Sequence, residues 1–140
     1  MIAPLYTRDI LRLAASIPHL EPLADPDGEA ELRSPTCGSR MWVAVRLDEH
    51  GRVTALSQRV EACAFGQATA ALMGQHAINS SREEAASALK GLSAWLAGER
   101  EDPGAWPGLA TLAPARLYTG RHGAILLPFH TLLAAIDAAS

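Results

Sequence analysis

The chain of 140 residues is poor in cysteine and in aromatic residues, and neither charge is in strong excess. Its two cysteines are too few for the disulfide framework of a small secreted domain. The formal net charge of −3 gives no reason to expect nucleic acid or an anionic membrane as a partner. No stretch reaches the roughly 18–20 apolar residues of a transmembrane helix, and the N-terminus lacks a signal-peptide layout. We therefore expect one cytoplasmic domain spanning residues 1–140, with reduced thiols.

The first half of the chain has the patterns of one short helix and three strands. Apolar and polar residues alternate from Met41 to Leu47, and a tight turn follows at Asp48-Glu49-His50-Gly51. This pattern predicts an antiparallel hairpin over residues 41–60. The expected elements are a helix over 7–17 with Thr7 as its N-cap, an edge strand over 29–35, and hairpin strands over 41–47 and 52–60.

The second half has helical spacing. Ser80 and Glu83 match a capping box, and Pro128 suits the last helix if it falls near the first turn. A loop rich in proline and glycine should let Trp106 fold back onto the body of the protein. Strands followed by helices predict an α+β fold, with helices packed on one face of a small antiparallel sheet. The expected helices are 65–77, 81–97, a short one near 109–112, and 124–138.

Both cysteines lie in segments typical of metal or sulfur chemistry. Cys37 lies in Pro35-Thr36-Cys37-Gly38-Ser39 ahead of an apolar strand, and Cys63 lies between a strand-like run and a helical one. Thiols at loop tips and helix N-termini are available as ligands or nucleophiles. These residues also allow a purely structural interpretation, because a free cysteine often behaves as a small buried hydrophobic residue and His122 could simply cap the last helix. The remaining histidines have no partner motif and are expected at the surface or in packing contacts: His19, His50, His76 and His130.

Three segments resemble one known family, the IscU/SufU/NifU N-terminal iron–sulfur scaffolds. Cys37-Gly38-Ser39 before a strand resembles the family's Cys-Gly-Asp segment, and Cys63 through Met73 resembles its second cysteine loop and the helix after it. Arg121-His122-Gly123 is similar to the segment that carries the third cysteine. Order and separation fit from about Tyr6 to Ala135, with three departures. Gly123 occupies the third-cysteine position, and Ser39 replaces the aspartate. The proline-rich chaperone-docking segment of the IscU branch has no clean counterpart before His122.

The resemblance implies an IscU/NifU-N-like fold with about three strands and a scaffold that is not an enzyme. Such a scaffold accepts sulfur from a cysteine desulfurase and passes a cluster to iron–sulfur acceptor proteins. The resemblance implies Cys37, Cys63 and His122 as ligands of a labile iron–sulfur cluster or of zinc, with Cys63 as persulfide acceptor. The alternative is a degenerate homologue that acts as a sulfur-relay or regulatory binding protein without cluster assembly. A thiol hydrolase would also need an oxyanion hole and an orienting Asp or Asn, which we do not identify.

Overall fold

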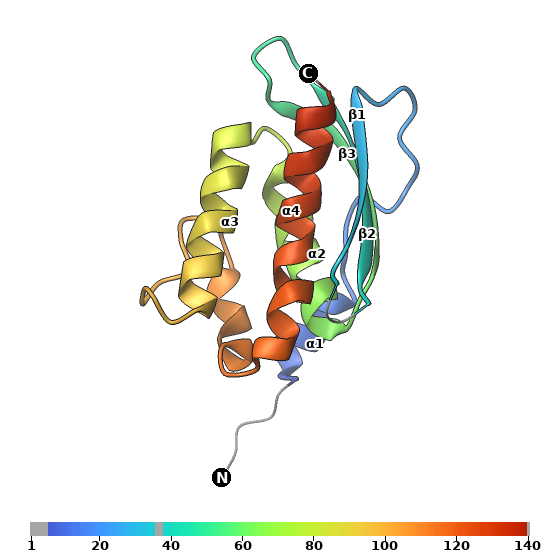
Figure 1. The fold of residues 1–140 in the computed structure, drawn as a ribbon. Coiled ribbons are helices and arrows are strands. Elements are labelled where there is room, and N and C mark those ends of the chain that lie inside the picture. The colour runs from blue at the N-terminus through green and yellow to red at the C-terminus, as the bar shows by residue number, and fades with distance from the viewer. Residues whose placement is uncertain (1–5, 36–37, 140) are drawn as a thin grey trace.

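The computed structural model describes residues 6–35 and 38–139, and it contains a three-stranded antiparallel sheet with helices on one side (Figure 1). The α+β fold class is confirmed, and every predicted strand and helix is present. The strands, in sheet order, are β1 (Gly28–Arg33), β2 (Arg40–Leu47) and β3 (Val53–Glu61). The helices are α1 (Arg8–Ala14), α2 (Ala64–Ala77), α3 (Arg82–Leu96) and α4 (His122–Ala138), with 3-10 helices η1 (Leu109–Ala115) and η2 (Thr119–Arg121).

The predicted hairpin is formed by β2 and β3. Alternate residues of β2 face the core, and the intervening Trp42 faces outward between the guanidinium groups of Arg40 and Arg59. At the turn, the Asp48 carboxylate accepts the backbone N–H of residues 50 and 52, both at 2.9 Å, and Gly51 has φ +78°. Positive φ carries no steric penalty for glycine, which explains its place in the turn. The buried β2 residues are Met41, Val43 and Val45.

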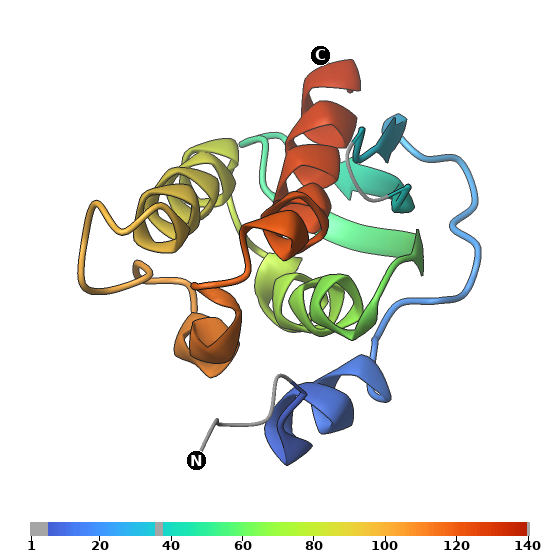
Figure 2. The ribbon, with the colours of Figure 1, turned by 60° about the horizontal axis from the view of Figure 1, so that its bottom comes forward.

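Two helices cover the sheet, and a third lies beyond them (Figures 1 and 2). Helix α4 packs on β1 and β2, while α2 packs on β3 and against α4. Helix α3 packs against α4, so the predicted packing of three helices on one face of the sheet holds for α2 and α4 only. Gly28 permits the close crossing of β1 and α4, because a Cβ there would lie 2.1 Å from the carbonyl oxygen of Ala135.

Helix α1 is shorter than its predicted range of 7–17. Thr7 is its N-cap as expected, and the Thr7 Oγ1 accepts a hydrogen bond from the Ile10 N–H at 3.2 Å. The helix ends at Ala14, and the N–H of Ser16 donates to the Leu13 carbonyl in a tighter turn. The apolar spacing in the sequence continues to Ile17, beyond the end of the helix at Ala14, so the sequence pattern predicted a helix that is too long.

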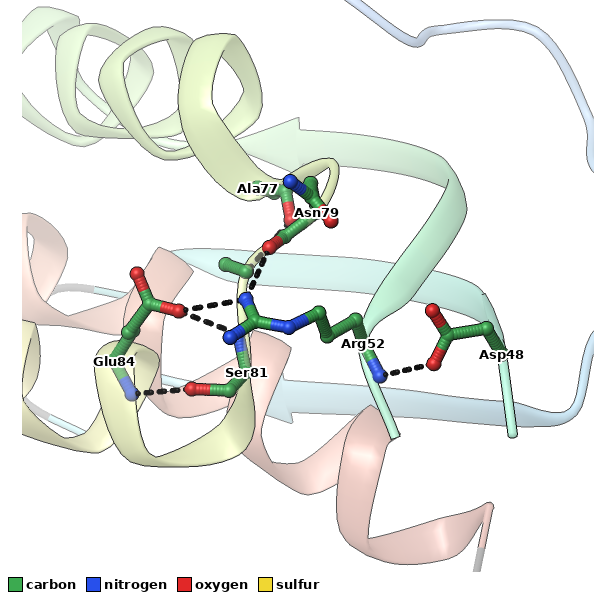
Figure 3. Close-up of polar contacts among 7 residues, drawn as sticks. Asp48, Arg52, Ala77, Asn79, Ser81 and Glu84 are labelled. Carbon is green, nitrogen blue, oxygen red and sulfur yellow. Dashed lines mark hydrogen bonds and ion pairs between the residues drawn. The ribbon is translucent and has the colours of Figure 1, made fainter. Parts of the chain in front are cut away.

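The β2–β3 turn is tied to the junction between α2 and α3 (Figure 3). The Arg52 Nη1 donates to the Asn79 carbonyl at 2.7 Å and lies 3.0 Å from the Glu84 Oε1. The Ser81 backbone N–H, and after it the Arg52 guanidinium, hold the pKa of the Glu84 carboxyl below its ordinary value by hydrogen bonding to the carboxylate. These contacts of Arg52 therefore connect the turn of the hairpin to the junction between α2 and α3.

The capping box of α3 lies one residue later than predicted. Ser81 and Glu84 form it: the Ser81 side chain accepts the Glu84 N–H at 3.1 Å, and the Glu84 carboxylate accepts the Ser81 N–H at 3.2 Å. Ser80 and Glu83 have the same spacing, so sequence could not separate the two pairs. Ser80 is instead buried, and its hydroxyl donates to the Ala77 carbonyl at the end of α2.

Trp106 folds back onto the helices, as predicted. Its ring is 8% exposed and meets the ring of Phe129 edge to face at 5.1 Å. The indole Nε1 donates to the Leu72 carbonyl in α2 at 2.9 Å, which satisfies the ring's one polar group. Among the described residues, no helix is both long and apolar enough to cross a membrane.

Candidate functional site

The beginnings of α2 and α4, which hold the predicted site residues Cys63 and His122, lie at one end of the sheet. Arg40 at the start of β2 pairs with Glu61 at the end of β3, so the start of β2 lies beside the segment that leads into α2. The Arg40 Nη2 and the Glu61 Oε1 are 3.0 Å apart and close this corner. Helices α2 and α4 both begin at this end, which comes forward in Figure 2.

The first turns of α2 and α4 are in direct contact through Gly66. A Cβ at Gly66 would lie 3.2 Å from the Ala124 carbonyl oxygen and 3.4 Å from the Ala124 Cβ. Pro128 lies beyond the first turn of α4, deeper than expected, and it has no N–H to donate to that carbonyl. Our sequence reasoning missed Gly66, although a glycine inside an otherwise helical pattern is itself a sign of close packing.

Cys63 occupies the N-cap position of α2. It is half-buried and packs against the hydrophobic core. Within the described part of the chain its side chain makes no capping hydrogen bond, and the first turn of α2 carries no acidic residue. A helix N-terminus favours negative charge, so this end of α2 suits a thiolate that binds a cation or attacks an electrophile.

His122 is the first residue of α4, and its imidazole ring is hydrogen-bonded to the end of η1. The Nε2 atom lies 3.1 Å from the carbonyl oxygen of Ala115 and 3.1 Å from that of Arg116. Carbonyl oxygens only accept hydrogen bonds, so Nε2 must be the protonated nitrogen. In the neutral imidazole this leaves a lone pair on Nδ1. The ring is therefore oriented by backbone carbonyls, and one nitrogen remains suited to ligation.

Arg116 is itself fixed at the end of α3. Its Nε donates to the Trp95 carbonyl at 3.0 Å, and its Nη2 donates to the Arg100 carbonyl at 3.3 Å. The guanidinium carbon lies 4.9 Å from the centre of the Trp95 ring. One of the two carbonyls that His122 contacts thus belongs to Arg116, whose side chain makes three contacts outside its own turn.

Cys37 lies outside the described residues, so the set of Cys37, Cys63 and His122 stays a prediction. Within residues 6–35 and 38–139, no group of three His, Cys, Asp or Glu side chains is placed to hold a metal ion. The connection that contains Cys37 is closed by the Ser34 N–H, which donates to the Ser39 carbonyl at 2.8 Å, and Ser39 is buried. The structure describes Cys63 and His122, and both lie at the end of the sheet where β2 starts.

The other four histidines are exposed, in agreement with their expected surface or packing roles. His50 lies in the hairpin turn beside Glu49, and His76 contacts the edge of Trp106. His130 lies two turns along α4 from His122, in a groove between α3 and α4. Its exposed place between α3 and α4 agrees with the expected surface role.

No family model matches the chain, and no curated protein matches it. Solved structures do. The structure of a nitrogen-fixing NifU-like protein (N-terminal) from Brucella abortus matches with a TM-score of 0.89 and 29% identity, covering 96% of this chain and 94% of that one. A putative iron–sulfur cluster assembly scaffold protein for the SUF system from Fervidobacterium islandicum AW-1 matches with a TM-score of 0.85 and 19% identity, covering 94% and 96%. A hypothetical protein matches with a TM-score of 0.74 and 23% identity, covering 95% and 97%. The resemblance to the NifU N-terminal and SufU scaffolds is confirmed across most of the chain.

Proposed function

We propose that this chain is an iron–sulfur cluster assembly scaffold, or a diverged relative, that takes a labile cluster or zinc on Cys37, Cys63 and His122. One observation supports the proposal: the first turns of α2 and α4 are in contact through Gly66 and Ala124, at the end of the sheet where β2 starts, and Cys63 and His122 lie at the beginnings of these two helices. The likeness to a NifU-like N-terminal protein over nearly the whole chain supports it.

The donor atoms suit soft and borderline metal ions. Two thiolates and one imidazole form a known ligand set for zinc, and thiolates also hold iron–sulfur clusters. The Ser39 hydroxyl is neutral near pH 7 and Gly123 offers no donor, so three donors leave one coordination position open. A partner protein or a small thiol would fill that position. An open position weakens retention, which suits a cluster that must be handed to an acceptor protein.

Sulfur would enter through Cys63. Its thiolate attacks the outer sulfur of a persulfide on a cysteine desulfurase, a new S–S bond forms at Cys63, and the desulfurase cysteine leaves as a thiolate. This exchange is redox-neutral and needs no further reactant. The position of Cys63 supports the role, because within the described residues its side chain makes no capping hydrogen bond at the start of α2.

A second candidate is a sulfur-relay or regulatory binding protein that keeps the fold and no longer builds clusters. The absence of a third thiolate at Gly123 and of a carboxylate at Ser39 favours it. The two candidates differ in one measurable property, which is the metal and sulfide that the purified protein retains under anaerobic conditions.

The test is anaerobic reconstitution followed by iron, sulfide and zinc analysis. We expect wild type to bind cluster or zinc weakly, Cys63→Ala, Cys37→Ala and His122→Ala to lose it, and His130→Ala to match wild type as the histidine control. Gly123 lies in α4 without positive φ, so its backbone accepts a side chain, and Gly123→Cys should bind more tightly. Equal trace amounts of iron, sulfide and zinc in wild type and all variants would reject the scaffold function. The second candidate, a sulfur-relay or regulatory binding protein, would then be favoured.

A further inference from the structure

We propose that Arg116 is a positioning residue for His122: its anchored backbone holds the ring as the Nε2–H tautomer and leaves Nδ1 as the nitrogen that binds metal. The assignment of Nδ1 to metal rests on the proposed function. The assignment of the tautomer rests on hydrogen bonds alone and can be tested without metal.

The tautomer follows from the two acceptors of the His122 Nε2. The carbonyl oxygens of Ala115 and Arg116 lie at the same distance, 3.1 Å, so one N–H is shared between them. Three-centre hydrogen bonds of this kind are common at helix termini. The opposite tautomer would turn a nitrogen lone pair toward two carbonyl lone pairs, and no hydrogen would lie between them. The geometry therefore selects Nε2–H.

The carbonyl of Arg116 stays in place because its side chain is fixed to α3. Arg116 stacks on Trp95, which is 3% exposed, and donates to the carbonyls of Trp95 and Arg100. The last turn of α3 has no basic residue of its own, so Arg116 supplies the positive charge that favours a helix C-terminus. In the described part of the chain, neighbouring Arg121 has no such side-chain contact.

An imidazole that binds a metal ion usually donates its second N–H to a carbonyl or a carboxylate. That donation sets the tautomer and the ring orientation, and removing it typically lowers metal affinity about 10–100-fold. Here the acceptors of the His122 N–H are the carbonyl oxygens of Ala115 and Arg116 at the end of η1. The position of these carbonyls depends on the Arg116 guanidinium, which is hydrogen-bonded to the end of α3. A lysine would keep the charge over Trp95, but it lacks the planar fork that reaches two carbonyls together.

The experiment compares Arg116→Met with Arg121→Met, which removes the same charge one residue from His122. Protein labelled with 15N at histidine is examined metal-free by long-range 15N–1H correlation at about pH 8, where imidazole is neutral. His122→Ala identifies the resonance. Zinc affinity is then measured by competition with a chelating dye, and circular dichroism checks folding. Arg116→Lys is the second variant if Arg116→Met does not fold.

We expect wild type and Arg121→Met to show His122 as a single Nε2–H tautomer. Arg116→Met should show a mixture of tautomers and bind zinc about 10–100-fold more weakly, with Arg116→Lys between the two. An Nδ1–H tautomer in wild type would overturn the proposal, as would a wild-type spectrum and wild-type zinc affinity in Arg116→Met. If wild type binds neither zinc nor an iron–sulfur cluster, the proposed function fails, while the tautomer measurement still decides the role of Arg116.

Discussion

The contact between α2 and α4 at Gly66 should control both stability and the site. Gly66→Ala adds one methyl group where the helices touch. The new Cβ would lie 2.6 Å from the Ala62 Cβ, a distance that carbon atoms do not adopt, and 3.2 Å from the Ala124 carbonyl oxygen. Neither neighbour is the end of a flexible side chain, so the backbone of α2, of α4 or of the connection that holds Ala62 must move.

Two opposing effects set the size of the change. Alanine is favoured over glycine inside a helix by about 1 kcal/mol. Overpacking of a well-packed contact costs roughly 1–3 kcal/mol. We expect the overpacking cost to lie in the upper part of its range and to exceed the gain in helix propensity, so Gly66→Ala should lower the free energy of unfolding by up to about 2 kcal/mol. Separation of the helix starts should also weaken zinc binding, because Cys63 and His122 lie on opposite sides of this contact.

Urea unfolding of Gly66→Ala, Ala62→Gly, the variant that combines them and a control measures the effect. Gly120→Ala is the control, because among the described residues nothing lies within 4 Å of a Cβ at Gly120. Ala62→Gly combined with Gly66→Ala removes the 2.6 Å contact and should restore part of the lost stability, as a coupling in a double-mutant cycle. If Gly66→Ala is as stable as wild type or more stable, the two helices are not in the close contact described.

Three further predictions concern the helices. Ser81→Ala removes the N-cap of α3 and should lower the free energy of unfolding by about 1 kcal/mol in urea titration. A hydrogen bond from Arg82 holds the pKa of the Asp137 carboxyl below its ordinary value, so this pair stabilises the fold above about pH 4 and the stability is lost as pH falls through the lowered pKa. Asp137→Asn should therefore flatten the acid side of a plot of urea midpoint against pH, and an unchanged plot would contradict this. Trp106→Phe loses the hydrogen bond to the Leu72 carbonyl and should cost about 1–3 kcal/mol in the same titration.

The local patterns of the sequence were sufficient for the secondary structure and the fold class. Alternation from Met41 to Leu47 and a turn with glycine at 51 specify a hairpin, because residues of one strand must alternate between core and solvent. Helical spacing likewise located α2, α3 and α4 to within a residue or two. The order of the cysteine and histidine segments also indicated the family resemblance, since that order follows directly from the chain.

The tertiary structure decided how those segments meet. Sequence spacing could not choose between Ser80 and Ser81 as the cap of α3, because the choice depends on which hydroxyl is buried against the end of α2. It also could not show that Gly66 touches Ala124, or that Arg116 reaches from η1 to α3. Helical and strand periodicity reflect interactions between near neighbours in the chain. The contacts that orient His122 join residues brought together only when the helices pack, so no local pattern records them.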